Sequence, residues 1–277
     1  MIIDSHRHLP LGNSDMAKLI AQMDADGFDK TVLFGFQGMN ISGTAHIQDK
    51  AVLMCARENP GRILPFLCDF DFYNENAPEY IRKFAAADEF YGVGEVLYGH
   101  TAIRKQYLSD RPIDGEDAIA VYRTAGSCGL PVLMHADPQY RNEFENAIEQ
   151  CPETNFIWAH IAYDFNATYG GAGCAVSYIK SLCDRFSNVF FDISHWTASP
   201  LYLCADEWRG LLESRSDRFL FGMDMTGDYM TERVWLRGYQ EILSGLSEEA
   251  RHNIYGKNVM DLLNINRRLP MTLRRYK

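Results

Sequence analysis

The sequence has 277 residues, of which 47% are hydrophobic and 13% are aromatic, and such a composition excludes a generally disordered chain. Its formal net charge of -10 at pH 7 argues against nucleic acid or an anionic membrane as the main partner, because both would repel an acidic protein. A small-molecule substrate is therefore the partner that we expect.

The amino terminus and the cysteines indicate the cellular compartment of the protein. The first residues lack a basic segment followed by an apolar run, and no stretch of the chain is apolar for long enough to span a bilayer. The 7 cysteines are scattered and form no C-x-x-C pair, which predicts reduced thiols without a metal-binding role. We therefore expect a soluble, cytoplasmic protein.

Short apolar runs beside turn residues alternate along the chain with longer segments of helical pattern. This order predicts parallel strands joined by helices. The predicted strands are Met1–Asp4, Thr31–Phe34, Ile63–Cys68, Tyr91–Val96, Pro131–His135, Phe156–His160, Val189–Ile193 and Phe219–Gly222. The predicted helices include Ser14–Ala25, Pro78–Ala87 and Glu116–Ala125, and others follow Pro138, Pro200 and Ser247.

Eight such units in 277 residues leave roughly 35 residues for each strand, helix and pair of loops. We therefore predict an α/β fold, a (β/α)8 TIM barrel that forms a single domain over residues 1–277, with a doubly wound open sheet as the alternative. The basic tail from Arg267 to Lys277 either docks on the barrel or on a neighbouring subunit of a homo-oligomer, or it stays solvated.

Two histidines, His6 and His8, follow the first predicted strand with one residue between them. The period of two in extended chain points both side chains the same way. Two converging imidazoles make half of a metal site, although a His-x-His pair also occurs by chance. Their meaning depends on the rest of the chain.

Four more polar residues stand at or near the ends of predicted strands: Glu95, His135, His160 and Asp224. In a parallel barrel the carboxyl ends of all strands gather at one face, where such folds place their chemistry. Each group alone could be satisfied by local hydrogen bonds. Because all of them share one face with the His-x-His pair, the sequence predicts a metal site, and imidazole with carboxylate favours zinc or a neighbouring first-row ion such as manganese or iron.

These motifs resemble the amidohydrolase superfamily, specifically its amidohydrolase-2 branch of metal-dependent barrel hydrolases and decarboxylases, over nearly the whole chain. The segment Asp4-Ser5-His6-Arg7-His8 resembles the first-strand motif of that family. Further matches are Leu130–His135 with the fifth strand, Cys151–His160 with the sixth, Arg218–Asp224 with the eighth and Ile254–Leu263 with the closing helix.

The resemblance implies roles for the residues at the strand ends. It makes His6, His8 and His135 metal ligands. It makes Asp224 both a ligand and the catalytic proton acceptor. The family residue that corresponds to His160 is a metal ligand in members that bind two metals. In members that bind one metal it is a polarising catalytic group.

The chain also departs from the family pattern beside two of these residues. Met223 and Met225 flank Asp224, where a serine before it and an aromatic residue followed by proline after it are common. Ile161 and Ala162 follow the sixth strand where glycines are usual. We therefore do not infer the substrate of this chain from the substrates of known members.

Glu95 decides whether the site holds one ion or two. It lies in Gly92-Val93-Gly94-Glu95-Val96, where the glycines let the backbone come close to its neighbours. The Gly-Glu pair resembles TatD-like deoxyribonucleases, in which a fourth-strand glutamate bridges two ions. The alternative is an ion pair of Glu95 with a barrel cation such as Arg7 or Lys105. We predict two ions, with Glu95 as a ligand of both.

We expect a metal-dependent hydrolase that cleaves a small amide, ester or lactone with a metal-activated water, and Asp224 as the general base and then acid. The alternatives are a metal-dependent decarboxylase of a small aromatic or unsaturated acid, and a metal-free barrel that serves as a binding scaffold. An arginine near the mouth would suit a carboxylate substrate, although a solvated surface arginine is the alternative. The candidate substrate-binding residues, chosen by position, are Tyr98, His100, Arg104, Asp164 and Trp196.

Overall fold

In the structure, a computed structural model, eight parallel strands follow one another in the order β1 to β8. This order excludes the open doubly wound sheet. The residues that the structure describes are 1–9, 16–36, 47–99, 111–162, 176–194, 205–225 and 229–267. The strands are Ile3–His8 (β1), Lys30–Phe34 (β2), Ile63–Leu67 (β3), Gly92–Gly99 (β4), Val132–Ala136 (β5), Phe156–Trp158 (β6), Val189–Asp192 (β7) and Phe219–Leu220 (β8).

The sheet closes into a barrel between β1 and the segment that follows β8. Arg7 forms a parallel bridge with Met225. The backbone N–H of Asp224 donates to the carbonyl of His6 at 2.8 Å. The chain after β8 therefore runs beside β1, and this pairing brings Asp224 next to the His-x-His pair.

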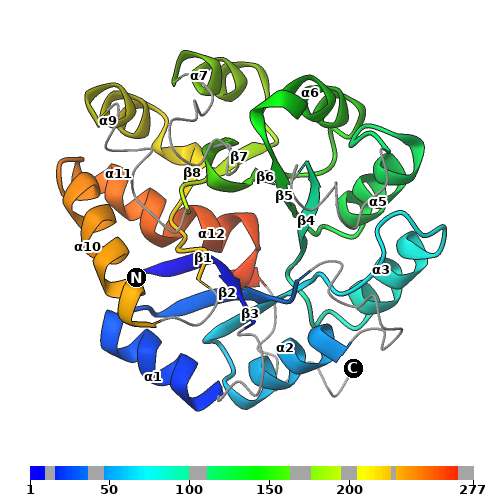
Figure 1. Cartoon of the computed structure of the whole chain (residues 1–277), viewed down its shortest axis with the longest axis horizontal. Coiled ribbons are helices and arrows are strands. Elements are labelled where there is room, and N and C mark those ends of the chain that lie inside the picture. Colours follow the sequence, from blue (N-terminus) through cyan, green and yellow to red (C-terminus); the bar gives the residue numbers. More distant parts are fainter. Residues whose placement is uncertain are drawn as a thin grey trace.

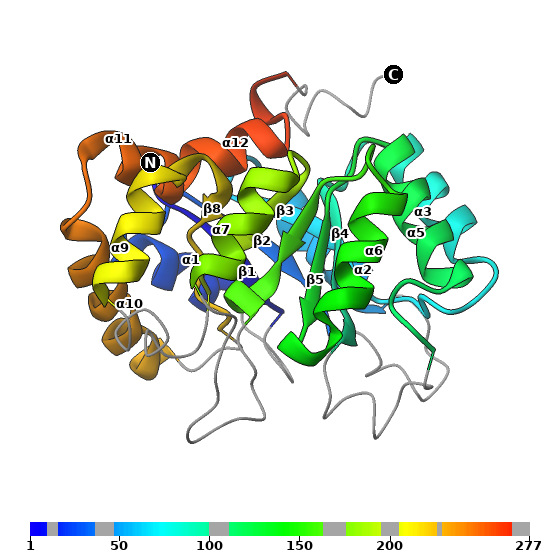
Figure 2. The ribbon, with the colours of Figure 1, turned by 90° about the horizontal axis from the view of Figure 1, so that it is seen from above.

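Helices surround the barrel as an outer ring (Figure 1). The helices α11 and α12 lie at the end of the barrel that also holds the amino terminus (Figure 2). Ser247 caps α11 by accepting a hydrogen bond from the N–H of Ala250 at 3.2 Å, which accounts for a helix beginning there. The helices are Met16–Asp26 (α1), Ile47–Glu58 (α2), Ala77–Ala86 (α3), Glu116–Ser127 (α5), Arg141–Gln150 (α6), Val176–Arg185 (α7), Ala205–Ser214 (α9), Tyr229–Ser244 (α10), Glu248–His252 (α11) and Asn258–Leu262 (α12).

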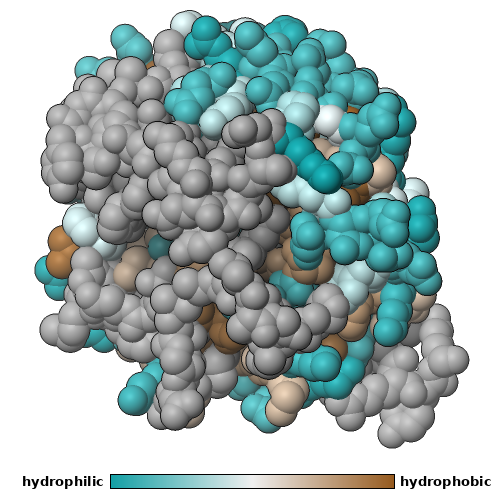
Figure 3. Space-filling view, turned by 45° about the vertical axis from the view of Figure 1, so that its right-hand side comes forward, coloured by the Kyte–Doolittle hydropathy of each residue, from teal (hydrophilic) through white to brown (hydrophobic). Residues whose placement is uncertain are grey.

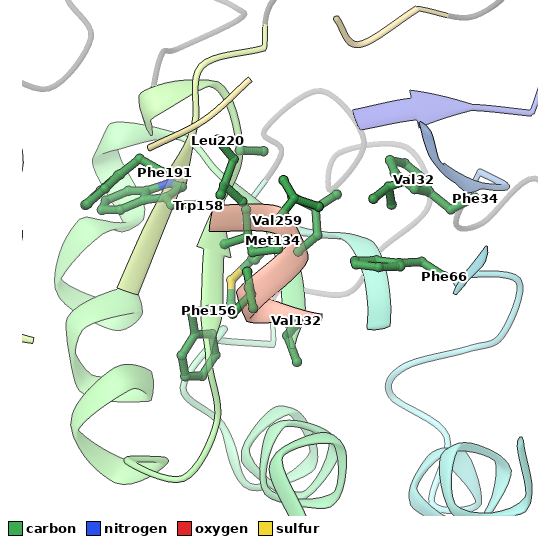
Figure 4. Packing of buried hydrophobic residues seen from close by; sticks show 14 of the residues in the cluster. Val32, Phe34, Phe66, Val132, Met134, Phe156, Trp158, Phe191, Leu220 and Val259 are labelled. Atoms are coloured by element: carbon green, nitrogen blue, oxygen red, sulfur yellow. The ribbon is translucent and has the colours of Figure 1, made fainter. Parts of the chain in front are cut away.

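The hydrophobic core takes residues from every strand and from the helices around them. Trp158 of β6 stacks on Phe191 of β7 with ring centroids 6.4 Å apart (Figure 4), and it packs against Phe144 of α6 at 4.2 Å. Hydrophilic residues cover most of the coloured surface in Figure 3. No helix of the described ranges combines the length and the apolar character that a bilayer crossing requires.

All eight predicted strands are present, but only the strand predicted at Thr31–Phe34 ends at the predicted residue, and three of the differences bear on the site. β1 runs on to His8, so the two histidines lie within the strand and not after it. β4 runs to Gly99, beyond the predicted end at Val96. β6 stops at Trp158 because His160 and Ile161 take left-handed backbone angles, with φ of 59° and 54°, which cannot continue a strand.

Candidate metal centre

The six residues predicted as ligands meet at the carboxyl end of the barrel strands. The nearest ligand atoms of His6, Glu95 and His160 lie within 4.8 Å of one another, and so do those of His6, His8 and Asp224. Asp224 is the most accessible of the six, with 18% of its side chain exposed, whereas Glu95 is 4% exposed. The six ligand candidates are His6, His8, Glu95, His135, His160 and Asp224.

Glu95 lies between two pairs of histidines. One oxygen, Oε2, is 3.5 Å from His6 Nε2 and 3.3 Å from His8 Nε2. The other, Oε1, is 3.2 Å from His135 Nδ1 and 3.4 Å from His160 Nε2. Each carboxylate oxygen thus faces its own pair of imidazoles, which is the arrangement of a carboxylate that could bridge two ions.

The second nitrogen of each imidazole ring faces a hydrogen-bond acceptor. An acceptor requires an N–H there, so a neutral ring directs its remaining lone pair toward the carboxylates at the centre. The pairs are His6 Nδ1 with Asp192 Oδ2 at 2.5 Å, His8 Nδ1 with the Gly35 carbonyl at 3.3 Å, His135 Nε2 with Asp137 Oδ1 at 3.1 Å and His160 Nδ1 with the Ser194 carbonyl at 2.9 Å.

Lone pairs that face carboxylate oxygens repel them unless a cation lies between. His6 Nε2 is buried without a hydrogen-bond partner in the part of the chain that the structure describes, and it lies 3.3 Å from Asp224 Oδ1. Burial alone would lower the pKa of His6, but the charges of Glu95 and Asp192 raise it well above its ordinary value. The cluster therefore attracts positive charge, and its nitrogen and oxygen donors fit a divalent ion such as zinc.

The pKa of Glu95 is shifted in the direction opposite to that of His6. Burial would raise the pKa of Glu95, but the charge of His6 and hydrogen bonds from His135 and His160 hold it well below its ordinary value. For His135 the opposing effects of burial and of hydrogen bonds to Asp137 and Glu95 leave the pKa raised to about 9. Metal binding must displace protons from such a cluster.

Two glycines allow the strands to bring these side chains together. A Cβ on Gly222 would lie 2.7 Å from Asp192 Oδ1 and 3.0 Å from His6 Cβ, so only glycine lets the chain after β8 pass this pair. Gly94 has φ of +124°, and a Cβ there would lie 2.2 Å from the Leu133 carbonyl oxygen. The close backbone approach predicted beside Glu95 is confirmed.

The alternative prediction, an ion pair between Glu95 and Arg7, is wrong. Arg7 Nε donates instead to Asp4 Oδ2 at 2.8 Å. The other oxygen of Asp4 accepts from the backbone N–H groups of His6, at 3.1 Å, and of Met223, at 2.9 Å. Asp4 and Arg7 thus hold β1 against the chain after β8 beneath the candidate metal centre. The other cation considered, Lys105, lies outside the described residues.

Tyr98 lies apart from this cluster. Its side chain is fully buried among the rings of Phe72, Tyr73 and Tyr122, with ring centroids 5.5, 4.5 and 6.2 Å away. This position does not support the predicted contact with substrate. The other candidate substrate-binding residues, His100, Arg104, Asp164 and Trp196, lie outside the described residues.

Sequence reasoning missed Asp137 and Asp192, the carboxylates that orient His135 and His6. Both are fully buried. Asp192 ends β7, so it occupies the same strand-end position that singled out the histidines. Asp137 comes two residues after His135, at the end of β5. Their position was the available signal, but their partners become visible only in three dimensions.

Replacing Asp192 with asparagine is expected to lower zinc affinity about 10-fold or more, since a neutral acceptor no longer supports the basicity of His6. Zinc titration against a competing chelator measures this. Asp184→Asn on α7, where the carboxylate is 46% exposed, is the matched control and should bind as the wild type does. Equal affinity in both variants would show that Asp192 does not tune the site.

Comparison with known proteins adds the family and the fold. The amidohydrolase family model matches residues 3–265. No curated protein matches the chain. A probable 2-pyrone-4,6-dicarboxylic acid hydrolase from Acinetobacter baumannii, solved with citric acid bound, is 13% identical, with a TM-score of 0.67 over 95% of this chain and 99% of the other.

Two further solved structures contain metal ions. An amidohydrolase from Burkholderia multivorans with bound zinc is 14% identical, with a TM-score of 0.68 over 95% of this chain and 99% of the other. A dihydroxybenzoic acid decarboxylase from Polaromonas sp. JS666, with bound manganese and the inhibitor 2-nitroresorcinol, is 14% identical. Its TM-score is 0.63, over 96% of this chain and 98% of the other. At these identities the likeness concerns the fold.

Proposed function

Because this chain belongs to the amidohydrolase family, we propose that it is a metal-dependent hydrolase of a small amide, ester or lactone, with Asp224 as its general base and then acid. The observation that carries the proposal is the convergence of four imidazoles on Glu95, beside a more accessible Asp224. A divalent ion held there would lower the pKa of a bound water to about 7 and polarise a carbonyl group.

The position and ionisation of Asp224 support its proposed role in proton transfer. Its Oδ1 lies 3.3 Å from the Nε2 atoms of both His6 and His8, and its side chain is the most accessible of the six ligand candidates. Burial would raise the pKa of Asp224, but the charges of His6 and His160 hold it below its ordinary value. An ionised Asp224 can accept a proton from an attacking water and return it to the leaving nitrogen or oxygen.

The contacts of Glu95 support two ions over one. His6, His8 and Asp224 would hold one ion on the Oε2 side of Glu95, and His135 and His160 would hold the other on the Oε1 side. Two ions in this position would both stabilise charge that develops on the substrate. Zinc suits these donors best, and manganese or iron are the alternatives.

A substrate screen tests the function. The panel holds lactones, including 2-pyrones, with esters, amides and aromatic carboxylates, and each is incubated with protein loaded with zinc or manganese. The proposal predicts hydrolysis of at least one lactone, ester or amide that a chelator abolishes and added metal restores. Release of carbon dioxide from aromatic acids, with no hydrolysis, would instead establish the decarboxylase.

A further inference from the structure

We infer that Gln48, on the first turn of α2, is a positioning residue for the ligand candidate His8 and acts through the Gly35–Phe36 segment. The inference rests on the proposed metal site. It adds a residue that lies outside the six ligand candidates and that touches none of them in the described contacts.

His8 is held on three sides by the chain at the end of β2. Its ring stacks on Phe36 with centroids 4.1 Å apart and an interplanar angle of 9°, and the edge of Phe34 approaches at 4.7 Å. Its Nδ1 faces the Gly35 carbonyl at 3.3 Å. The direction of His8 Nε2 toward the centre therefore depends on where residues 35 and 36 lie.

The side-chain amide of Gln48 fixes those two residues. Its Oε1 accepts from the backbone N–H of Phe36 at 2.9 Å, and its Nε2 donates to the carbonyl of Phe36 at 3.1 Å. These two bonds imitate the pairing of a neighbouring strand at a point beyond the end of β2. A Cβ on Gly35 would lie 2.7 Å from Gln48 Cβ, so the glycine is what lets Gln48 come this close.

Gln48 is itself anchored by the end of the next strand. Its backbone N–H donates to Asp69 Oδ2 at 2.8 Å. The N–H of Asp69 in turn donates to Asp49 Oδ1 at 3.0 Å. The first turn of α2 and the end of β3 thus form a fixed base from which Gln48 reaches Phe36.

The test measures the affinity for Co²⁺ and the visible absorption spectrum of the bound ion in the full-length protein. Gln48→Met keeps the length of the side chain but removes both bonds to Phe36, and it should weaken Co²⁺ binding about 10-fold and change the spectrum. Phe36→Leu should cause a similar loss. Gln150→Met, at the exposed end of α6, is the matched control and should bind as the wild type does.

A double-mutant cycle separates positioning from general destabilisation. If Gln48 acts through the Gly35–Phe36 segment, the double variant should lose less affinity than the sum of the two single losses, whereas fully additive losses would overturn the inference. Wild-type affinity in Gln48→Met or in Phe36→Leu, each with a thermal melt that shows folded protein, would also overturn it and leave the proposed function intact. No Co²⁺ binding by the wild type would refute the metal site and this inference together.

Discussion

Replacing Asp224 with asparagine is expected to lower kcat by about 100- to 10,000-fold, because the amide can occupy the same position but cannot accept a proton. The fold should survive, since asparagine has nearly the same size and shape as aspartate. Asp224 lies at the accessible edge of a site whose other carboxylate, Glu95, is enclosed by histidines. Asp224 is therefore the more solvent-accessible of the two carboxylates among the ligand candidates.

The measurement is kcat at saturating metal, with a substrate that the screen identifies, so that weaker metal binding does not account for the loss. Asp217→Asn, whose carboxylate is 58% exposed on the short helix Ser216–Arg218, is the matched control and should keep wild-type turnover. A variant at position 224 that keeps more than about a tenth of the rate would retain all but about 1.4 kcal/mol of the barrier reduction. Asp224 would then not be the base.

Gly94→Ala is expected to lower the free energy of unfolding by about 3 kcal/mol or more. Its Cβ would lie 2.2 Å from the carbonyl oxygen of Leu133 in the neighbouring strand β5, and backbone cannot move aside as a flexible side chain can. The displacement would also move Glu95, the next residue, away from the four histidines. Urea denaturation measures the loss of stability, and zinc titration measures the loss of affinity.

Gly129→Ala separates this clash from the backbone angle. Gly129 also has positive φ, at +68°, but a Cβ there would meet nothing within 4 Å. The control should therefore lose only the about 1–2 kcal/mol that a left-handed angle costs a residue with a side chain. Equal losses in the two variants would mean that β4 and β5 can separate without penalty.

The barrel and the ligand candidates could be predicted from sequence because local patterns encode them. An apolar run that ends in a histidine, as before His135, marks both a strand and the face at which it ends. The boundary of β6 could not be predicted in this way, because Ile161 takes a left-handed angle that a β-branched residue rarely adopts. Glycine suits that angle, which accounts for the glycines usual in the family at this position but not for the isoleucine of this chain.

The residues that orient the ligand candidates were not predictable, because their partners are distant in the sequence. Asp192 bonds His6 across 186 positions. Gln48 acts on a residue 12 positions earlier and is anchored by one 21 positions later. Such contacts depend on how the strands meet when the barrel closes, and the hydrophobic periodicity of the sequence does not record them. The substrate contacts expected of His100, Arg104, Asp164 and Trp196 stay predictions.

The most direct test of the metal-dependent function is the number of divalent ions bound per chain. Protein stripped with a chelator and titrated with zinc should bind two ions, and Glu95→Gln should bind one, because an amide cannot bridge two ions as a carboxylate does. One ion in both proteins would contradict the bridging role of Glu95. Less than about a tenth of an equivalent in the wild type, with zinc, manganese, nickel and iron(II) all tried, would contradict the metal-dependent hydrolase itself and favour a metal-free scaffold.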